Sequence, residues 1–185
     1  YVVLLIGVLL YGVITSYLFN REYVENTLKN VLTIPVSKIS IIISKLALLL
    51  IWIITLTVVS WVLTLILGLI GSFVGLNTII LIKSFKEYII GGSLLFLLST
   101  PTIFVTLVFK DYVPAIVFTI AVTMVNVLIS NSKYSALYPW SAVLVVATNG
   151  FRPEYSSIYS YIFIAATSII GFATTIIYFK NVDVK

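Results

Sequence analysis

Residues 46–71 read LALLLIWIITLTVVSWVLTLILGLIG and contain no ionisable side chain. A helix of about 20 apolar residues crosses a bilayer, because each residue adds about 1.5 Å and the hydrocarbon core is about 30 Å thick. A membrane β-strand would instead alternate apolar and polar residues over about ten positions, and this run does not. Since backbone groups cannot remain unpaired in lipid, the run predicts a membrane-spanning α-helix.

The composition of the whole chain indicates the same solvent. The 185 residues are 61% hydrophobic and 9% charged, and the mean hydropathy is +1.20. Soluble domains carry about 25% charged residues, so this chain has too few charges to cover a surface in water. We therefore predict a single all-α domain that forms a polytopic membrane protein, with membrane lipid around it, in the bacterial cytoplasmic membrane.

Five apolar runs are long enough to cross a bilayer. They are residues 2–19, 39–71, 88–109, 113–130 and 158–179. An odd number of crossings leaves the two chain ends on opposite sides of the membrane. Because an even number is the commoner plan, we expect one further helix before Tyr1.

The basic residues predict the orientation of these helices, because Lys and Arg in short loops favour the cytoplasmic side. If residues 20–38 are cytoplasmic, seven basic residues lie inside and four outside. The inside set is Arg21, Lys29, Lys38, Lys45, Lys110, Lys180 and Lys185, and the outside set is Lys83, Lys86, Lys133 and Arg152. Lys45, near the end of its run, can extend its ammonium group towards the interface.

This orientation places two segments outside, residues 72–87 and residues 131–157. At the first, residues 79–88 (IILIKSFKEY) predict a helix lying flat in the membrane interface. In the second, residues 135–148 (SALYPWSAVLVVAT) are too short to cross the bilayer. Buried against other helices, they would form a re-entrant element.

Several kinds of chemistry are excluded by what the sequence lacks. With no Cys and no His, the usual zinc sites and histidine base catalysis are excluded. The P-loop pattern G-x-x-x-x-G-K-[ST] does not occur, and no ionisable residue lies at the centre of a predicted span, as ion-coupled carriers require. Clustered Lys and Arg, the mark of nucleic-acid binding, are also missing. We expect no catalytic residue, no metal and no cofactor in this chain.

A charged segment, NREYVENTLKNVLTIPVSKISIIISKL at residues 20–46, interrupts the apolar sequence. Its apolar side chains recur at i, i+4, i+7 and i+8: Val24, Leu28, Val31 and Leu32. This spacing predicts a short amphipathic helix over residues 21–34, ended by Pro35, with Ser37 placed to cap the next helix. The helix either anchors the loop at the interface or docks a cytoplasmic partner.

The same segment resembles the cytoplasmic coupling segment of ABC-2 type permeases, particularly those of the bacitracin and lantibiotic immunity branch. The matching residues are Glu22, Thr27, Leu32, Pro35, Val36, Ser37 and Lys45. Asn26 replaces the usual Gly, Lys38 the usual Arg, and Val31 one Leu. The family, which is type V exporter-like, has six transmembrane helices with this segment between the second and third, so the chain would supply the second to the sixth.

The resemblance implies a permease half that pairs with a second copy or a homologue and rests its coupling helix on a separately encoded ABC ATPase. ATP and Mg would bind to that partner. The contact residues it implies are Arg21, Glu22, Glu25, Asn26, Thr27, Leu28, Lys29, Leu32 and Pro35. The implied substrate is an amphipathic peptide, a cell-envelope antibiotic or a lipid-like molecule. The alternative is a non-transporting membrane sensor or assembly factor.

Two further groups of residues leave alternatives open. In the span at residues 39–71, Thr57, Ser60 and Thr64 share one face. With Trp52 and Trp61 they either pack helices together or line a substrate path or dimer seam. Near the outer face, Tyr138, Trp140 and Tyr155 belong either to an interfacial aromatic belt or to an outer gate.

Overall fold

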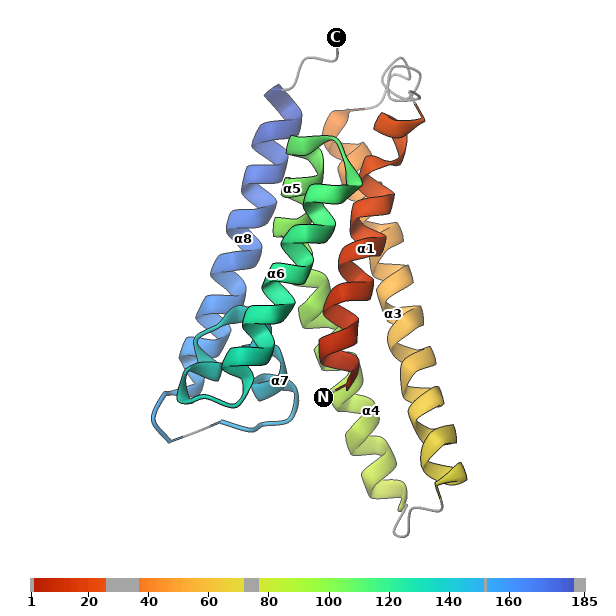
Figure 1. The fold of residues 1–185 in the computed structure, drawn as a ribbon, viewed down its shortest axis with the longest axis vertical. Helices are drawn as coiled ribbons and strands as arrows, with labels where there is room; N and C mark the ends of the chain where they lie inside the picture. Colours follow the sequence, from red (N-terminus) through yellow and green to blue (C-terminus); the bar gives the residue numbers. More distant parts are fainter. Residues whose placement is uncertain (1, 26–36, 72–76, 152, 182–185) are drawn as a thin grey trace.

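The computed structural model describes residues 2–25, 37–71, 77–151 and 153–181, and this part of the chain folds as helices joined by short turns. The elements in order are α1 (Val2–Val24), α3 (Lys38–Ile70), α4 (Thr78–Leu97), α5 (Thr100–Phe109), α6 (Tyr112–Ser130), the 3₁₀ turn η1 (Lys133–Ala136), α7 (Pro139–Ala147) and α8 (Ser157–Asn181). The long helices run up and down an elongated bundle (Figure 1).

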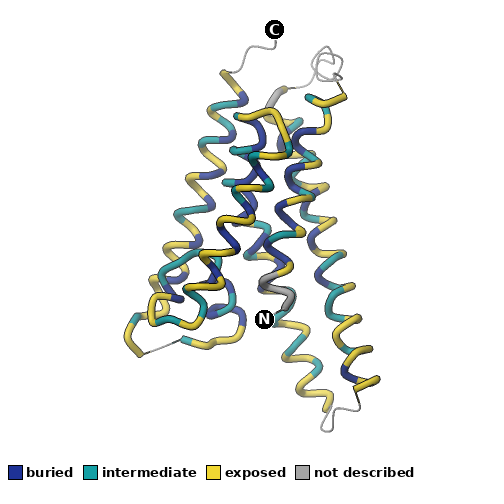
Figure 2. The backbone as a smooth tube through the Cα atoms, in the orientation of Figure 1, coloured by how far each residue is buried: buried dark blue, intermediate teal, exposed yellow. Residues whose placement is uncertain are grey.

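Within the described residues, four helical segments are long and apolar enough to cross a membrane: Ile39–Ile70, Thr78–Phe109, Tyr112–Ser130 and Ser157–Asn181. The predicted span at residues 2–19 lies within α1, whose 23 residues extend over about 34 Å. Exposed residues follow the outer faces of the helices and buried residues face the bundle interior (Figure 2). The prediction of an all-helical polytopic membrane protein is therefore confirmed.

Small residues let the helices approach closely in the interior. A Cβ atom added at Gly12 of α1 would lie 2.3 Å from Thr119 Cγ2 of α6. One added at Gly171 of α8 would lie 2.7 Å from the Pro101 nitrogen of α5. Buried Thr hydroxyls mostly donate to their own helix, as Thr119 does to Ala115 O at 2.8 Å. Packing of small side chains is the usual basis of helix association in lipid.

The predicted third span is a broken helix. α4 ends at Leu97 and α5 begins at Thr100, with Pro101 in its first turn. Pro101 has no N–H, so a backbone carbonyl is left without its helical partner. The Thr100 hydroxyl lies 3.0 Å from the carbonyl oxygens of both Leu97 and Ser168 and donates to them. The carbonyl group at the break thereby gains a hydrogen-bond donor, and α8 packs against this position.

The prediction of a separate interfacial helix at residues 79–88 is wrong. α4 begins at Thr78 and continues through these residues without interruption, side by side with α3 (Figure 1). Polar side chains explain the difference. Ser84 accepts a hydrogen bond from Trp61 Nε1 at 3.1 Å, and Tyr88 pairs with Thr64 at 2.9 Å. The segment packs against α3 through these contacts.

The predicted start of the amphipathic helix at residue 21 is also wrong. Arg21 and Glu22 belong to the last turn of α1, which continues to Val24, and residues 26–36 lie outside the described residues. The predicted cap is confirmed, because the Ser37 hydroxyl accepts a hydrogen bond from Ser40 N at 3.1 Å at the start of α3.

The α7 helix fills the opposite end of the bundle from the end of α1. Most of its residues are buried, including Ser141, Ala142 and Val143, and it packs against α4, α6 and α8. This agrees with a short apolar element surrounded by other helices. That α7 lies on the outer side of the membrane stays a prediction.

Candidate functional site

The end of α1 and the beginning of α3 are joined by an ion pair. Lys45 Nζ donates to the Glu22 carboxylate and, at 3.0 Å, to the Leu18 carbonyl oxygen. The ammonium group also lies 5.4 Å from the centroid of the Phe19 ring. The two side chains are 17% and 21% exposed. Lys45 is thus held by α1, and the extension of its ammonium group towards the interface stays a prediction.

The remaining charged residues on this turn of α1 point outward. Arg21 Nε donates to Glu25 Oε1 at 2.9 Å, and the two side chains are 54% and 46% exposed. Among the predicted coupling residues, Arg21 and Glu25 are thus accessible to a partner, while Glu22 is turned towards α3. The others lie outside the described residues, so their coupling role stays a prediction: Asn26, Thr27, Leu28, Lys29, Leu32 and Pro35.

The turn between α5 and α6 lies at the same end of the bundle (Figure 1). Lys110 caps α5 in the left-handed conformation with φ 54°, and its Nζ lies 5.8 Å from the Tyr23 ring centroid of α1. Asp111 caps α6 by accepting a hydrogen bond from Val113 N at 3.4 Å. This turn therefore presents exposed charges beside the α1 terminus.

The polar face of α3 is occupied by partners within the chain. Thr57 donates to Ile53 O at 2.7 Å, so the hydrogen bond of 2.8 Å between Thr57 and Tyr11 uses the Tyr11 hydroxyl as donor. Trp61 and Thr64 bond to α4 as described above. Thr57, Trp61 and Thr64 therefore contact neighbouring helices of the same chain, and their role in a path or seam stays a prediction. Ser60 is half-buried beside them, and Trp52 is 48% exposed. The role of these two residues in a path or seam also stays a prediction.

The aromatic residues predicted as an outer gate contact different neighbours. Tyr138 donates to Val122 O at 3.0 Å, and its ring lies 5.5 Å from that of Trp140. Burial raises the pKa of the Tyr138 phenol to about 12. Tyr155 instead contacts Tyr134 and Tyr159, with ring centroids 6.4 Å and 6.5 Å apart. Whether either group acts as a gate stays a prediction.

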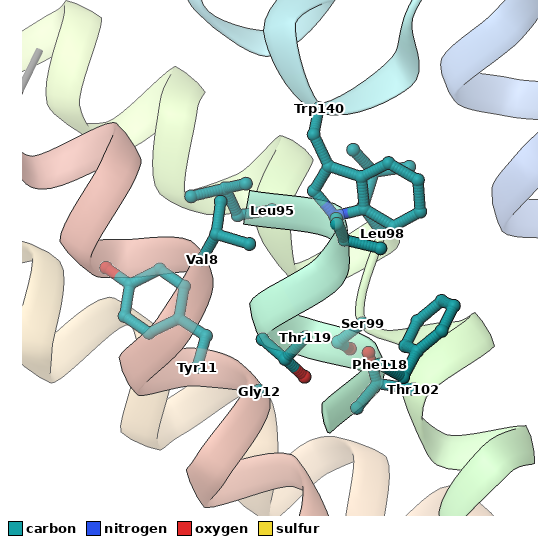
Figure 3. A pocket seen from close by; sticks show the side chains of 11 residues that line it. Val8, Tyr11, Gly12, Leu95, Leu98, Ser99, Thr102, Phe118, Thr119 and Trp140 are labelled. Carbon is teal, nitrogen blue, oxygen red and sulfur yellow. The ribbon is translucent and has the colours of Figure 1, made fainter. Parts of the chain in front are cut away.

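A small cavity lies between α1, α4, α5, α6 and α7 (Figure 3). It measures about 10 Å³, room for about one water molecule. Its lining includes Tyr11, Gly12, Ser99, Thr119 and Trp140. A peptide does not fit such a space, so in this conformation the interior of one chain is closed to an amphipathic substrate at this point.

Residues 1–126 match the family model described as ABC-2 family transporter protein. The chain belongs to this family. It is also similar to the bacitracin transport permease protein BCRB of Bacillus licheniformis, with 62% identity over 184 residues, covering 100% of this chain and 88% of that protein. No solved structure matches the chain.

The described helices agree with what is expected of an ABC-2 transporter protein. The helices cross the cell membrane several times, as predicted, and the resemblance drawn from residues 22–45 is confirmed by the family match.

Two features of this ABC-2 protein were not predicted from its sequence. One is the pairing of Glu22 with Lys45, although both residues belong to the family-like motif. The other is the small cavity, whose lining comes from five helices and the turn between α4 and α5. The available signal was the lone Lys45 inside an apolar run, since a charge in such a place usually has a partner.

Proposed function

We propose that this chain is the permease subunit of an ABC exporter that moves a peptide antibiotic of the bacitracin type. The observation that carries the proposal is the 62% identity to a bacitracin transport permease over the whole chain. The outward export direction and the amphipathic peptide substrate follow the family resemblance. Nucleotide hydrolysis belongs to a separate ATPase that binds ATP and Mg.

The ATPase docks at the end of the bundle where α1 ends and α3 begins. Exposed charges support this location: the Arg21–Glu25 pair on α1 and Lys110 on the α5–α6 turn. Rim charges of this kind steer association and set its salt dependence more than they add affinity. The coupling residues predicted between positions 26 and 36 belong to the same proposed contact.

The substrate path lies along the surface of the bundle, between this chain and a second permease. The cavity in Figure 3 has room for about one water molecule, which supports a path outside the single chain. The exposed apolar face of α3, which carries Ile51 and Trp52, offers an amphipathic peptide a surface at membrane depth.

Co-purification and resistance test this proposal together. The tagged full-length permease is expressed with a candidate ABC ATPase from the same organism, extracted in detergent and assayed for bound ATPase. Cells with and without the pair are then grown in bacitracin. Bound ATPase and a higher inhibitory concentration support the proposal. A permease that binds no ATPase, or a pair that gives no protection, contradicts it, and binding of a sensor kinase in place of the ATPase favours a sensor.

A further inference from the structure

The ion pair between Glu22 and Lys45 links the end of α1 to the start of α3. The two residues are 23 positions apart in the sequence, and residues 26–36 lie between them. Glu22 is on the last turn of α1, and Lys45 is two turns into α3. Because the Lys45 ammonium also donates to Leu18 O at 3.0 Å, it holds α1 through both a side chain and the backbone.

This pair differs from the exposed ion pairs of the molecule in its surroundings. Its side chains are 17% and 21% exposed, so the two charges attract each other in a medium of lower dielectric constant than water. Removing one member leaves the other poorly solvated and without its counter-charge. By contrast, Arg21–Glu25 and Lys83–Glu87 link residues four positions apart on one helix and are more exposed, where such pairs contribute little.

The neighbouring helices contact the pair differently. A cavity of about 10 Å³ lies beside it, and the α5 and α8 side chains lining this cavity are apolar, Leu107 and Phe179. Apolar contacts are non-directional, whereas the charged groups of Glu22 and Lys45 fix one helix against the other. At this end of the bundle, the ion pair therefore holds α1 to α3 by a directional contact, whereas the α5 and α8 residues beside the pair contribute apolar surface and Lys110 of the α5–α6 turn contacts the Tyr23 ring.

We infer that Glu22 and Lys45 are positioning residues that make the end of α1 and the start of α3 move as one unit. This inference rests on the proposed coupling to an ATPase. A displacement of residues 26–36 then moves both helices together and reaches α6 through Gly12–Thr119 and α4 through Thr64–Tyr88. Without the pair, the Tyr11–Thr57 bond still joins the middle of α1 to α3, but the end of α1 and the start of α3 are no longer linked, and ATP hydrolysis drives transport less effectively.

The test neutralises each member and then exchanges the charges. The variants are Glu22→Gln, Lys45→Gln, the conservative Lys45→Arg, and Glu22→Lys combined with Lys45→Glu. Lys83→Gln is the matched control, because it removes one Lys charge from an exposed pair on α4. Each full-length permease is expressed with its ATPase. The measurements are ATPase retained on the purified permease, its hydrolysis rate, and the bacitracin concentration that halves growth.

The neutral variants are expected to retain bound, active ATPase but to lose bacitracin protection by about tenfold, within the range by which single residues change coupling between sites. Lys45→Arg should keep protection, and Lys83→Gln should match the wild type. The exchanged pair should restore part of the protection lost in the neutral variants, because it re-forms the ion pair but a Glu at position 45 cannot donate to Leu18 O. A purely structural role would lower protein yield and bound ATPase together, without separating hydrolysis from protection.

Wild-type protection in both neutral variants overturns the inference, as does an exchanged pair that yields no protection, whether or not it inserts. If a neutral variant yields no protein, the exchanged pair decides the question: recovered yield and protection support the inference. A wild-type permease that binds no ATPase contradicts the proposed function itself, which separates that failure from failure of the ion pair.

Discussion

The contact between Gly12 and Thr119 offers a sharp test of how the helices pack. A Cβ atom at Gly12 would lie 2.3, 2.5 and 2.9 Å from the Cγ2, Oγ1 and Cβ atoms of Thr119. Thr119 cannot easily rotate away, because its hydroxyl donates to Ala115 O at 2.8 Å. Gly12→Ala must therefore separate α1 from α6 or break this bond, and overpacking of this kind costs about 1–3 kcal/mol.

Gly7→Ala is the matched control for this prediction. Gly7 lies on the same helix and is also buried, but a Cβ atom there would have its nearest neighbour, Leu95 Cδ1, at 3.5 Å, an ordinary van der Waals distance. The gain in helix propensity from Gly to Ala, about 1 kcal/mol, is common to both variants. The difference in stability between them therefore isolates the contact with Thr119.

The assay is thermal unfolding in detergent, followed by the loss of the monodisperse peak in fluorescence-detected size-exclusion chromatography. For a domain of this size, 1 kcal/mol shifts the midpoint by about 2–4 °C, so Gly12→Ala should unfold about 2–12 °C below Gly7→Ala. Adding Thr119→Ala should recover most of the difference. Equal midpoints for Gly12→Ala and Gly7→Ala would refute the close approach of α1 and α6.

Three further outcomes are expected. Tyr11→Phe or Thr57→Val removes the hydrogen bond between α1 and α3 and should lower the free energy of unfolding by about 0.6–1.7 kcal/mol, measured by the same assay. If the double variant loses the full sum of the two single effects, the two hydroxyls do not interact. Ser37→Ala should cost about 0.5–2 kcal/mol by removing the cap of α3, while Ser37→Asn keeps it; equal midpoints would argue against the cap. In this chain without Cys, Lys133→Cys should react with a membrane-impermeant thiol reagent in intact cells, and reaction only after lysis would invert the predicted orientation.

The membrane spans were predictable because hydropathy follows from local composition. The predicted run at residues 39–71 and helix α3, Lys38–Ile70, differ by one residue at each end. The shared face of Thr57 and Thr64 was also predictable from helical period, and both residues do contact neighbouring helices. Which helices they contact depends on the arrangement of the bundle, and the sequence pattern carries no information on it.

The errors occurred where polar or charged side chains find partners on another helix. The apolar spacing from Val24 to Leu32 predicts a new helix that begins with Arg21 and Glu22. The α1 backbone continues through them, since Glu22 is neutralised by Lys45. Similarly, Lys83 and Glu87 suggested a helix lying in the interface, but the polar groups of Ser84 and Tyr88 pair with α3.

The length of α3 couples this permease to the thickness of its membrane. The uncharged part of the helix, from Leu46 to Ile70, extends over about 37 Å, against a hydrocarbon core of about 30 Å. Such hydrophobic mismatch is relieved by tilting the helix or by thickening the surrounding bilayer, at a cost of fractions of a kcal/mol per Å. α4 runs beside α3, and the Trp61–Ser84 and Thr64–Tyr88 hydrogen bonds join the two helices. They therefore tilt as a pair. Lipids with longer acyl chains would reduce this mismatch and favour a smaller tilt of the pair, so membrane thickness bears on the helix that begins at the coupling end.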